Sequence, residues 1–350
     1  MQKLSLDEVK AGMILAKDVV LKDGRILLLK GFTIKPRYIS KLKSYDVPYI
    51  YVEKDGVELE EFNEDRVYGD AFSSIKGIME CIRNDKKYDL VQLKETVYDM
   101  VGHILNDDML FMTLTGIRDI DNYTFLHSVD VCIYSVITAK AMNLQYDEIH
   151  ELAMAAILHD VGKCKIPISI LNKPGKLTDE EFEIMKRHSL YGYEIARQMP
   201  GVSEKTARII SQHHEKWDGT GYPAGLKNYD IELGARIISI ADVYDALTAD
   251  RIYRKRFMPH EAAEYLMADN ESQFDSEIMK TFINSIAIYP KDVVVLLNTG
   301  EVARVLPSKG MASLRPKVSV ITKKDGPPVF TPYEIDLREN PTIFVTDIIS

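Results

Sequence analysis

Residues that can bind metal ions gather at two places in the middle of the chain. His159 and Asp160 are adjacent, and His213, His214 and Glu215 form a second group further on. Imidazole nitrogens and carboxylate oxygens are metal ligands, and one carboxylate can bridge two ions because it has two oxygens. A single His-Asp pair is common on protein surfaces, so the first group alone does not establish a metal site.

The second group is followed by a loop rich in turn-forming residues. Residues 216–223 have the sequence KWDGTGYP. Neighbouring residues on a helix point about 100° apart, so His213 and His214 can face one site only where a helix ends. Glycine and proline favour a tight turn whose backbone can approach a ligand closely. The sequence therefore predicts one pocket formed by the two histidines and this loop.

Helices are predicted next to these ligands. Residues 148–158 are rich in helix formers, carry an apolar face and end directly before the His-Asp pair. Residues 178–199 and 203–214 are predicted as two further helices, and the second of them ends in the paired histidines. The first begins at Thr178, with Glu181 three positions later, which is a capping-box pattern.

The periodicity of apolar residues divides the chain into four segments. Residues 1–55 alternate short apolar runs with turn signals such as Asp23-Gly24, and we expect a small β-rich domain with one short helix near Pro36–Tyr45. The other segments are an acidic linker over 56–66, a helical domain over 67–289 and a β-rich segment over 290–350, with strands at 293–297, 302–306 and 318–322. The predicted fold is mainly α, with β-rich ends.

Composition limits the partners and the compartment. The 350 residues include 44 Lys and Arg against 53 Asp and Glu, a formal charge of −9, which argues against long nucleic acids and anionic membranes. The cysteines Cys81, Cys132 and Cys164 form no Cys-x-x-Cys pair, so a zinc knuckle or a disulfide framework is not expected. No signal peptide and no apolar run of about 20 residues is present, and the sequence predicts a cytoplasmic protein.

Two motifs resemble those of a known family. HDVGK at 159–163, followed by HHEKWDGTGYP at 213–223, is similar to the paired motifs of the HD-GYP family, a helical subset of the HD superfamily. The resemblance extends over roughly residues 100–290 and includes His127, His188 and the segment IADVYDALT at 240–248. It implies an HD-type helical bundle that hydrolyses cyclic di-GMP, a bacterial second messenger.

The resemblance also implies two divalent metal ions, with iron ahead of manganese. One ion would be held by His127, His159, Asp160 and Asp242, and the other by Asp160, His188, His213 and His214. Asp160 would then be the bridge. Carboxylates and imidazoles without a thiolate suit iron or manganese. Family members with a third metal have a glutamate four residues before the first histidine, where this chain has Tyr123.

The expected reaction follows from the same resemblance. A hydroxide bridging the two metals would attack phosphorus and give linear 5′-pGpG, and a second cleavage would give GMP. The residues predicted to be catalytic are Asp160 and Lys163. The residues predicted to contact the substrate are Lys163, Asp218, Gly221, Tyr222, Arg251 and Arg254, although the family usually has proline where this chain has Ile252.

Several residues near the motifs have an alternative interpretation. Glu215 is expected to orient one of the histidines through its second ring nitrogen, rather than to bind metal. Asp218 is either a turn former or a substrate contact, and Asp245 is either a cap or a partner of a metal ligand. The residues expected to be ordinary packing or surface groups are His103, His150, Cys164, Trp217 and His260.

Three other functions compete with the first. The chain could hydrolyse another cyclic dinucleotide, such as a guanine–adenine hybrid, or act on nucleotides as other HD proteins do, although the 216–223 loop argues against the latter. It could also be a cyclic di-GMP receptor without turnover, but every matched ligand and Lys163 are present. A homodimer, or signalling contacts through the terminal segments, also remains open.

Overall fold

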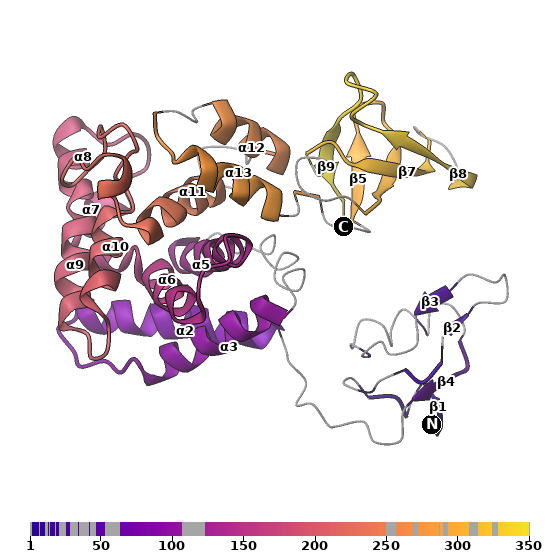
Figure 1. Ribbon diagram of the computed structural model, residues 1–350, viewed down its shortest axis with the longest axis horizontal. Coiled ribbons are helices and arrows are strands. Elements are labelled where there is room, and N and C mark those ends of the chain that lie inside the picture. The colour runs from indigo at the N-terminus through magenta and orange to yellow at the C-terminus, as the bar shows by residue number, and fades with distance from the viewer. Residues whose placement is uncertain are drawn as a thin grey trace. The chain divides into compact units, whose positions relative to one another are not determined.

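The structure is a computed structural model of the 350-residue chain, which forms two compact units, Met1–Glu64 and Asp65–Ser350. It describes residues 64–106, 123–249, 257–268, 272–286, 288–289, 293–307, 314–323 and 328–349, and in the first unit residues 2–6, 8–10, 13, 15–17, 19–20, 26–28, 34, 42 and 47–52. Figure 1 shows the helices and strands of each unit.

The first unit contains short antiparallel strand pairs. β1 (Gln2–Ser5) pairs with β4 (Tyr49–Val52), and β2 (Val19–Val20) pairs with β3 (Ile26–Leu28). The pairing of β2 with β3 confirms the predicted hairpin, although Asp23-Gly24 lies outside the described residues. The helix predicted near Pro36–Tyr45 also lies outside them, apart from Leu42. A small apolar core that includes Leu4, Leu15, Ile34, Leu42 and Ile50 holds the strands together.

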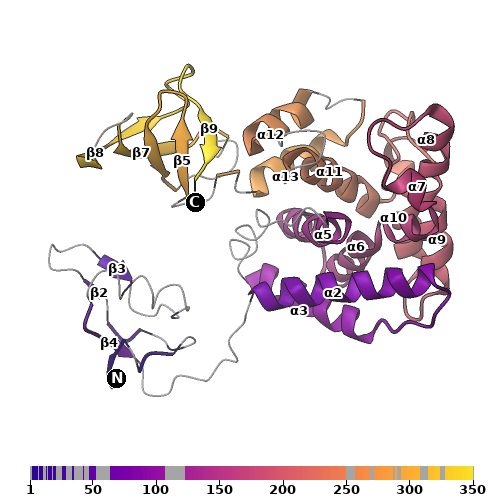
Figure 2. The ribbon, with the colours of Figure 1, turned by 180° about the vertical axis from the view of Figure 1, so that it is seen from behind.

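The second unit is mainly helical, which confirms the predicted fold class (Figure 2). Its described helices are α2 (Glu64–Arg83), α3 (Val91–Asn106), α5 (Tyr123–Ala141), α6 (Tyr146–Leu158), η2 (Val161–Lys165), α7 (Ile168–Leu171), α8 (Asp179–Lys186), α9 (His188–Gln198), α10 (Glu204–Gln212), η3 (Asn228–Asp230), α11 (Leu233–Thr248), α12 (Pro259–Ala268) and α13 (Ser276–Ser285). In the part of the chain that the structure describes, no helix has both the length and the hydropathy needed to cross a bilayer.

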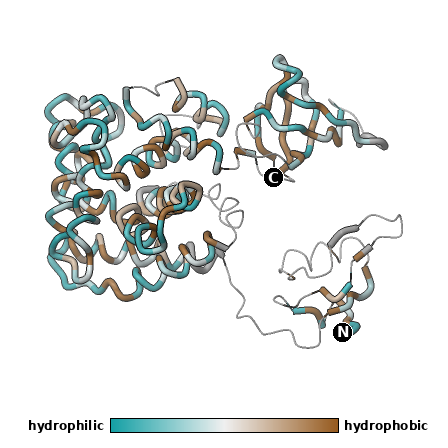
Figure 3. The backbone as a smooth tube through the Cα atoms, viewed as in Figure 1, coloured by the Kyte–Doolittle hydropathy of each residue, from teal (hydrophilic) through white to brown (hydrophobic). Residues whose placement is uncertain are grey.

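The helix α5 lies at the centre of this bundle. Every residue from 127 to 139 on α5 is buried, and α3, α6, α11 and α13 pack around it. A helix that is buried on all sides is apolar over most of its circumference, unlike the amphipathic helices that surround it, although α5 also buries polar residues such as His127 and Asp130. Teal and brown segments alternate along the outer helices (Figure 3). The buried position of α5 explains how His127, near its start, reaches the interior.

The helix predicted over residues 178–199 is interrupted. The structure has α8 and α9 in its place, separated at Arg187. The ring of His188 donates to the carbonyl of Met185 at 2.7 Å, and the hydroxyl of Ser189 donates to the carbonyl of Lys186 at 2.9 Å. These side chains compete with backbone N–H groups for the carbonyls at the break. The capping box of Thr178 is confirmed.

A five-stranded antiparallel sheet follows the helices. It contains β5 (Val294–Leu297), β6 (Val302–Val305), β7 (Lys317–Thr322), β8 (Pro328–Asp336) and β9 (Val345–Ile348), in the order β8-β7-β6-β5-β9. The three predicted strands are confirmed as β5, β6 and β7, whereas β8 and β9 were not predicted. The predicted linker over 56–66 is partly described: its last residues already belong to α2, which begins at Glu64.

Candidate metal centre

The end of α6 places His159 and Asp160 in the interior. Both are almost fully buried, with exposed fractions of 0% and 1%. The chain leaves α6 at His159 and continues directly into η2, so the two side chains project from a helix end, as predicted. The ring of His159 donates through Nδ1 to the carbonyl of Ala156 at 2.7 Å. Its Nε2 therefore carries the lone pair that is available to a metal ion.

Gly162 lets η2 approach α9 closely. A Cβ atom at this position would lie 1.9 Å from the backbone oxygen of His188 and 2.5 Å from the backbone nitrogen of Gly192. Because these are backbone atoms, no side chain can move aside to make room. Because position 162 has no side chain, α9 can pack close to η2, and this brings His188 near Asp160.

We expect Gly162→Ala to destabilise the protein and to weaken its metal binding. The methyl group should cost at least about 2 kcal/mol, because it meets rigid backbone. Gly77→Ala, on the exposed face of α2 with nothing within 4 Å, is the matched control and should stabilise the helix by about 0.5–1 kcal/mol. Urea unfolding of both variants measures the two effects. A Gly162→Ala variant as stable as the Gly77→Ala variant would contradict this account.

A second group of ligands comes from α5 and α11. His127 Nε2 lies 3.0 Å from Asp242 Oδ1, and its Nδ1 donates to Asp245 Oδ2 at 2.6 Å. Asp245 is fully buried and follows Asp242 by three residues, so both carboxylates lie on one face of α11. Asp245 is therefore the partner of a predicted metal ligand, which decides between its two interpretations.

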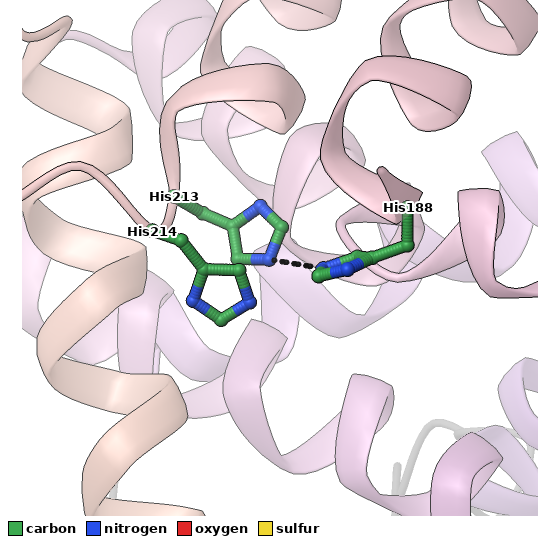
Figure 4. A group of neighbouring side chains, drawn as sticks. All are labelled: His188, His213 and His214. Atoms are coloured by element: carbon green, nitrogen blue, oxygen red, sulfur yellow. Dashed lines mark hydrogen bonds between the residues drawn. The ribbon is translucent and has the colours of Figure 1, made fainter. Parts of the chain in front are cut away.

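The third group comes from the start of α9 and the end of α10. His188 and His213 each donate through Nδ1 to a carbonyl three residues earlier, Met185 O at 2.7 Å and Ile210 O at 2.6 Å. Their Nε2 atoms face each other at 3.3 Å, with His214 beside them (Figure 4). With both protons on Nδ1, two nitrogen lone pairs point at one another. A metal ion next to both nitrogens removes the repulsion between them.

The two oxygens of Asp160 face different groups. Oδ2 lies 3.4 Å from His159 Nε2 and 4.0 Å from His127 Nε2. Oδ1 lies 3.6 Å from His188 Nε2. Ligands of one metal ion at about 2.1 Å are separated by about these distances. Asp160 thus stands between the two groups of histidines, with one oxygen directed to each.

The charge states suit metal binding. Burial lowers the pKa of His214 to about 3, and burial together with neighbouring imidazoles holds the pKa of His213 well below its usual range. Burial alone would raise the pKa of Asp160, but the charges of Lys163, His159 and His188 hold it well below its usual range. At neutral pH these imidazoles are neutral and the carboxylate is ionised, which are the forms that bind metals.

The surroundings of His127 favour its protonated form. Burial would lower its pKa, but hydrogen bonds to Asp242 and Asp245 raise the pKa well above its usual value. A metal ion that binds Nε2 must replace the proton shared with Asp242. Metal binding at this position therefore releases a proton.

Two buried atoms are suited to bind a metal ion. In the described part of the chain, His159 Nε2 and Asp160 Oδ1 are buried without a hydrogen-bond partner. Buried polar atoms rarely lack a hydrogen-bond partner, because the free energy lost when they leave water is then not regained. The groups whose ligand atoms lie within 4.8 Å of one another are His188, His213 and His214; His127, His159 and Asp242; and His159, Asp160 and His213. The residues present therefore fit a metal centre of imidazoles and carboxylates.

The loop after His214 is held by Glu215. Its carboxylate is buried and accepts backbone N–H groups from Ala224, Gly225 and Leu226 at 2.7 to 3.1 Å. The expectation that Glu215 orients a histidine is therefore wrong. The carboxylate instead closes the loop over residues 216–226, because three backbone donors converge on it and no histidine does.

Two loop residues predicted to contact the substrate have structural contacts. The carboxylate of Asp218 accepts the backbone N–H of Thr220 at 2.8 Å and its hydroxyl at 2.7 Å, which is a turn-forming role. A Cβ at Gly221 would lie 2.3 Å from the backbone nitrogen of Lys216, so this glycine is required for loop packing. Contact of either residue with a substrate stays a prediction.

Tyr222 lies at the rim of the centre. Its ring centroid is 4.8 Å from that of His214 and 6.5 Å from that of His188. The ammonium of Lys186 lies 5.7 Å from the Tyr222 ring and 5.0 Å from that of Phe182. The sequence motifs did not identify Lys186 as a residue next to Tyr222. Its position two residues before His188 was the one feature of the sequence that could have indicated this.

The remaining predicted residues have three different outcomes. Arg251 and Arg254 lie outside the described residues, so their predicted contact with the second phosphate stays a prediction. The residues placed in packing or surface roles include Cys164, which is buried, and Trp217, whose ring lies against Tyr229. Lys163 is brought to the centre, where its Nζ lies 2.5 Å from Asp160 Oδ2.

Two parts of the chain match known protein families. Residues 123–278 match a family described as an HD domain. Residues 294–350 match a family described as a KOW domain associated with the HD domain. The first range contains all the predicted metal ligands, and the second contains the C-terminal sheet.

Relatives with assigned activities are similar to part of this chain. A cyclic di-GMP phosphodiesterase of Pseudomonas aeruginosa is 34% identical over 250 residues, which are 71% of this chain and 60% of that protein. A 3′3′-cGAMP-specific phosphodiesterase of Vibrio cholerae is 36% identical over 195 residues, which are 55% of this chain and 36% of that protein. The chain thus spans less than two thirds of the length of either relative.

A solved structure shares the fold. An HDG"Y"P protein from Bdellovibrio bacteriovorus has a TM-score of 0.54 to this chain, at 19% sequence identity. The match covers 80% of this chain and 97% of the other. At this identity the match shows a common fold and nothing further.

Proposed function

Residues 123–278 match the HD domain family, and from this premise we propose that the protein is a metal-dependent phosphodiesterase of the HD-GYP type that hydrolyses cyclic di-GMP. The observation that carries the proposal is the position of Asp160 between two groups of histidines, with one carboxylate oxygen directed to each. The name of the Pseudomonas relative supports the choice of substrate.

The proposed ligands follow the two groups. His127, His159 and Asp242 would hold one divalent ion. The other would be held by His188, His213 and His214, and Asp160 would contribute an oxygen to each ion. Two such ions would activate water as the nucleophile and withdraw charge from the phosphate oxygens. The donor set of imidazoles and carboxylates favours iron or manganese.

The protein's own groups prepare this chemistry. The Nδ1–H bonds of His159, His188 and His213 to backbone carbonyls fix the rings, so their Nε2 atoms stay directed at the centre. Lys163 places an ammonium beside the bridging carboxylate, where the phosphate would bind. Tyr222, at the rim, offers a ring for stacking on a base, which is worth about 1–3 kcal/mol.

The experiment that tests the proposal is direct. The full chain, purified without oxygen and loaded with Fe²⁺ or Mn²⁺, should hydrolyse cyclic di-GMP, and a chelator should abolish the activity. Metal-loaded, folded protein that binds cyclic di-GMP without consuming it would make the chain a receptor and overturn the proposal.

The first product is expected to be linear 5′-pGpG that has taken its new phosphate oxygen from solvent. Attack of water in line with the 3′ oxygen leaves the phosphate on the 5′ side, and no covalent intermediate forms. Hydrolysis in oxygen-18 water followed by mass spectrometry measures this. A 3′-phosphate product, or an unlabelled 5′-phosphate in a single turnover, would reverse the assignment. GMP should appear later, because the linear product must bind again.

A second candidate substrate is the guanine–adenine hybrid. It is favoured by the name of the Vibrio relative, which is specific for 3′3′-cGAMP. Competition between the two cyclic dinucleotides at equal concentration, with both products measured, distinguishes them. The cytoplasmic location and the contacts through the terminal segments stay predictions.

A further inference from the structure

A cavity lies apart from the predicted metal ligands. It has a volume of about 260 Å³, between α3, α6 and the start of α10. Its walls include Lys94, Tyr98, His150, Glu151 and Ser203, and none of the predicted metal ligands. The volume is below the range of about 300–1,000 Å³ that is usual for drug-sized ligands, so it suits a smaller molecule.

The cavity is lined by two helices that end at the metal centre. α6 begins at Tyr146 and leads to His159, and α10 begins at Glu204 and leads to His213. The lining residues of α6 are His150, Glu151 and Met154, in its second and third turns, whereas Ser203 and Thr206 come from the start of α10. An occupant would therefore contact both helices, and α10 at the end opposite to its metal ligands.

His150 is a buried polar group without a partner. It is 7% exposed, and in the described part of the chain neither of its ring nitrogens has a hydrogen bond. Burial lowers its pKa, so the ring is neutral and offers one donor and one acceptor. The Tyr98 ring stacks on it with 4.0 Å between centroids, and this tyrosine is 55% exposed. Tyr146 lies edge-on to the same imidazole at 4.3 Å, so a ligand ring would reach His150 on the face where the exposed Tyr98 ring now stacks.

The charges around the cavity are unbalanced. Glu151 is neutralised by Lys205 at 2.9 Å and accepts a hydrogen bond from Ser203. Lys94 donates to the carbonyl of Pro200 at 2.9 Å, and no carboxylate of the described residues lies within ion-pair distance of it. One ammonium group thus remains to attract an anion.

We propose that this cavity binds a small planar organic anion of the aromatic carboxylate class. The carboxylate pairs with Lys94, and the ring lies in the apolar part of the cavity against His150. Tyr98 already shows that a flat ring can stack at this position. Val97, Met154 and Val202 supply the apolar wall.

The test uses benzoate as the probe and the full chain with its metals. A ligand of this size should bind with a Kd of about 1 mM. Benzyl alcohol, which has the ring without the charge, should bind at least about tenfold more weakly, and Lys94→Met should weaken benzoate binding at least about tenfold. Titrations followed by NMR measure each Kd. Lys280→Met, on an exposed lysine of α13 that pairs with Glu277, is the control and should bind benzoate normally.

Two results would overturn the proposal. One is the absence of saturable benzoate binding to the folded protein. The other is binding that survives Lys94→Met but disappears in Asp160→Ala, because the carboxylate would then be binding at the metal centre. Lys94 is partly exposed and not part of the core, so loss of folding does not confuse the comparison. None of these measurements depends on phosphodiesterase activity.

Discussion

An Asp160→Ala variant is expected to lose both metal ions together and to lower kcat/KM by at least about 10³-fold, which is about 4 kcal/mol. Asp160 has one oxygen 3.4 Å from His159 Nε2 and the other 3.6 Å from His188 Nε2, and its side chain is more deeply buried than that of Asp242, whose second oxygen lies 3.9 Å from His214 Nδ1. Two divalent ions a few ångström apart repel each other when no shared anion lies between them. Removal of the Asp160 carboxylate should therefore weaken the binding of both ions, whereas removal of one histidine should weaken mainly the binding of one ion.

The comparison needs three variants and one control. His127→Ala and His188→Ala should each retain about one ion per chain after reconstitution with Mn²⁺ and desalting, measured by plasma mass spectrometry. Asp179→Ala, at an exposed aspartate of α8, should retain both ions. Circular dichroism checks that Asp160→Ala is folded. Retention of two ions by that variant would exclude Asp160 as the bridge.

A Lys163→Met variant is expected to bind metal at least as tightly as the native protein while losing most hydrolysis. The Lys163 ammonium lies 2.5 Å from Asp160 Oδ2, where it competes with a cation for the same oxygen. Its removal favours metal binding by this oxygen. The same ammonium is proposed to stabilise the phosphate in the transition state, and its loss should cost about 2–4 kcal/mol, or about 30- to 1,000-fold in kcat/KM.

Lys165 provides the matched control. It lies on the same η2 helix and pairs at the surface with Asp85 at 3.6 Å, away from the ligands. Lys165→Met should bind metal and hydrolyse substrate normally. Near-native turnover by Lys163→Met would assign Lys163 a structural role. Weaker metal binding by that variant would show that the lysine supports Asp160 instead of competing for it.

Much of the fold could be predicted because its signals are local. Apolar periodicity and the cap at Thr178 located the helices, and turn residues separated the strands β5, β6 and β7. The strand β9 could not be found in this way, since it forms by pairing with β5. The break between α8 and α9 depends on side-chain hydrogen bonds to carbonyls, which helix periodicity does not report.

The sequence by itself determined which residue types are available for chemistry and where they stand along the chain. His159, Asp160, His213 and His214 lie at helix ends, and those ends follow from local propensity. The resemblance of the two motifs added His127, His188 and Asp242, which no local rule identifies.

The tertiary structure alone decided which partner each of these groups has. Asp245 hydrogen bonds to His127, 118 positions away, and Glu215 binds the backbone of its own loop instead of a histidine. Both carboxylates had more than one plausible local role. The choice depends on which donors the packing of α5, α10 and α11 brings within about 3 Å of a buried carboxylate, because a buried charge must find hydrogen bonds there. That distance is a property of the packed helices and is not encoded in any single segment.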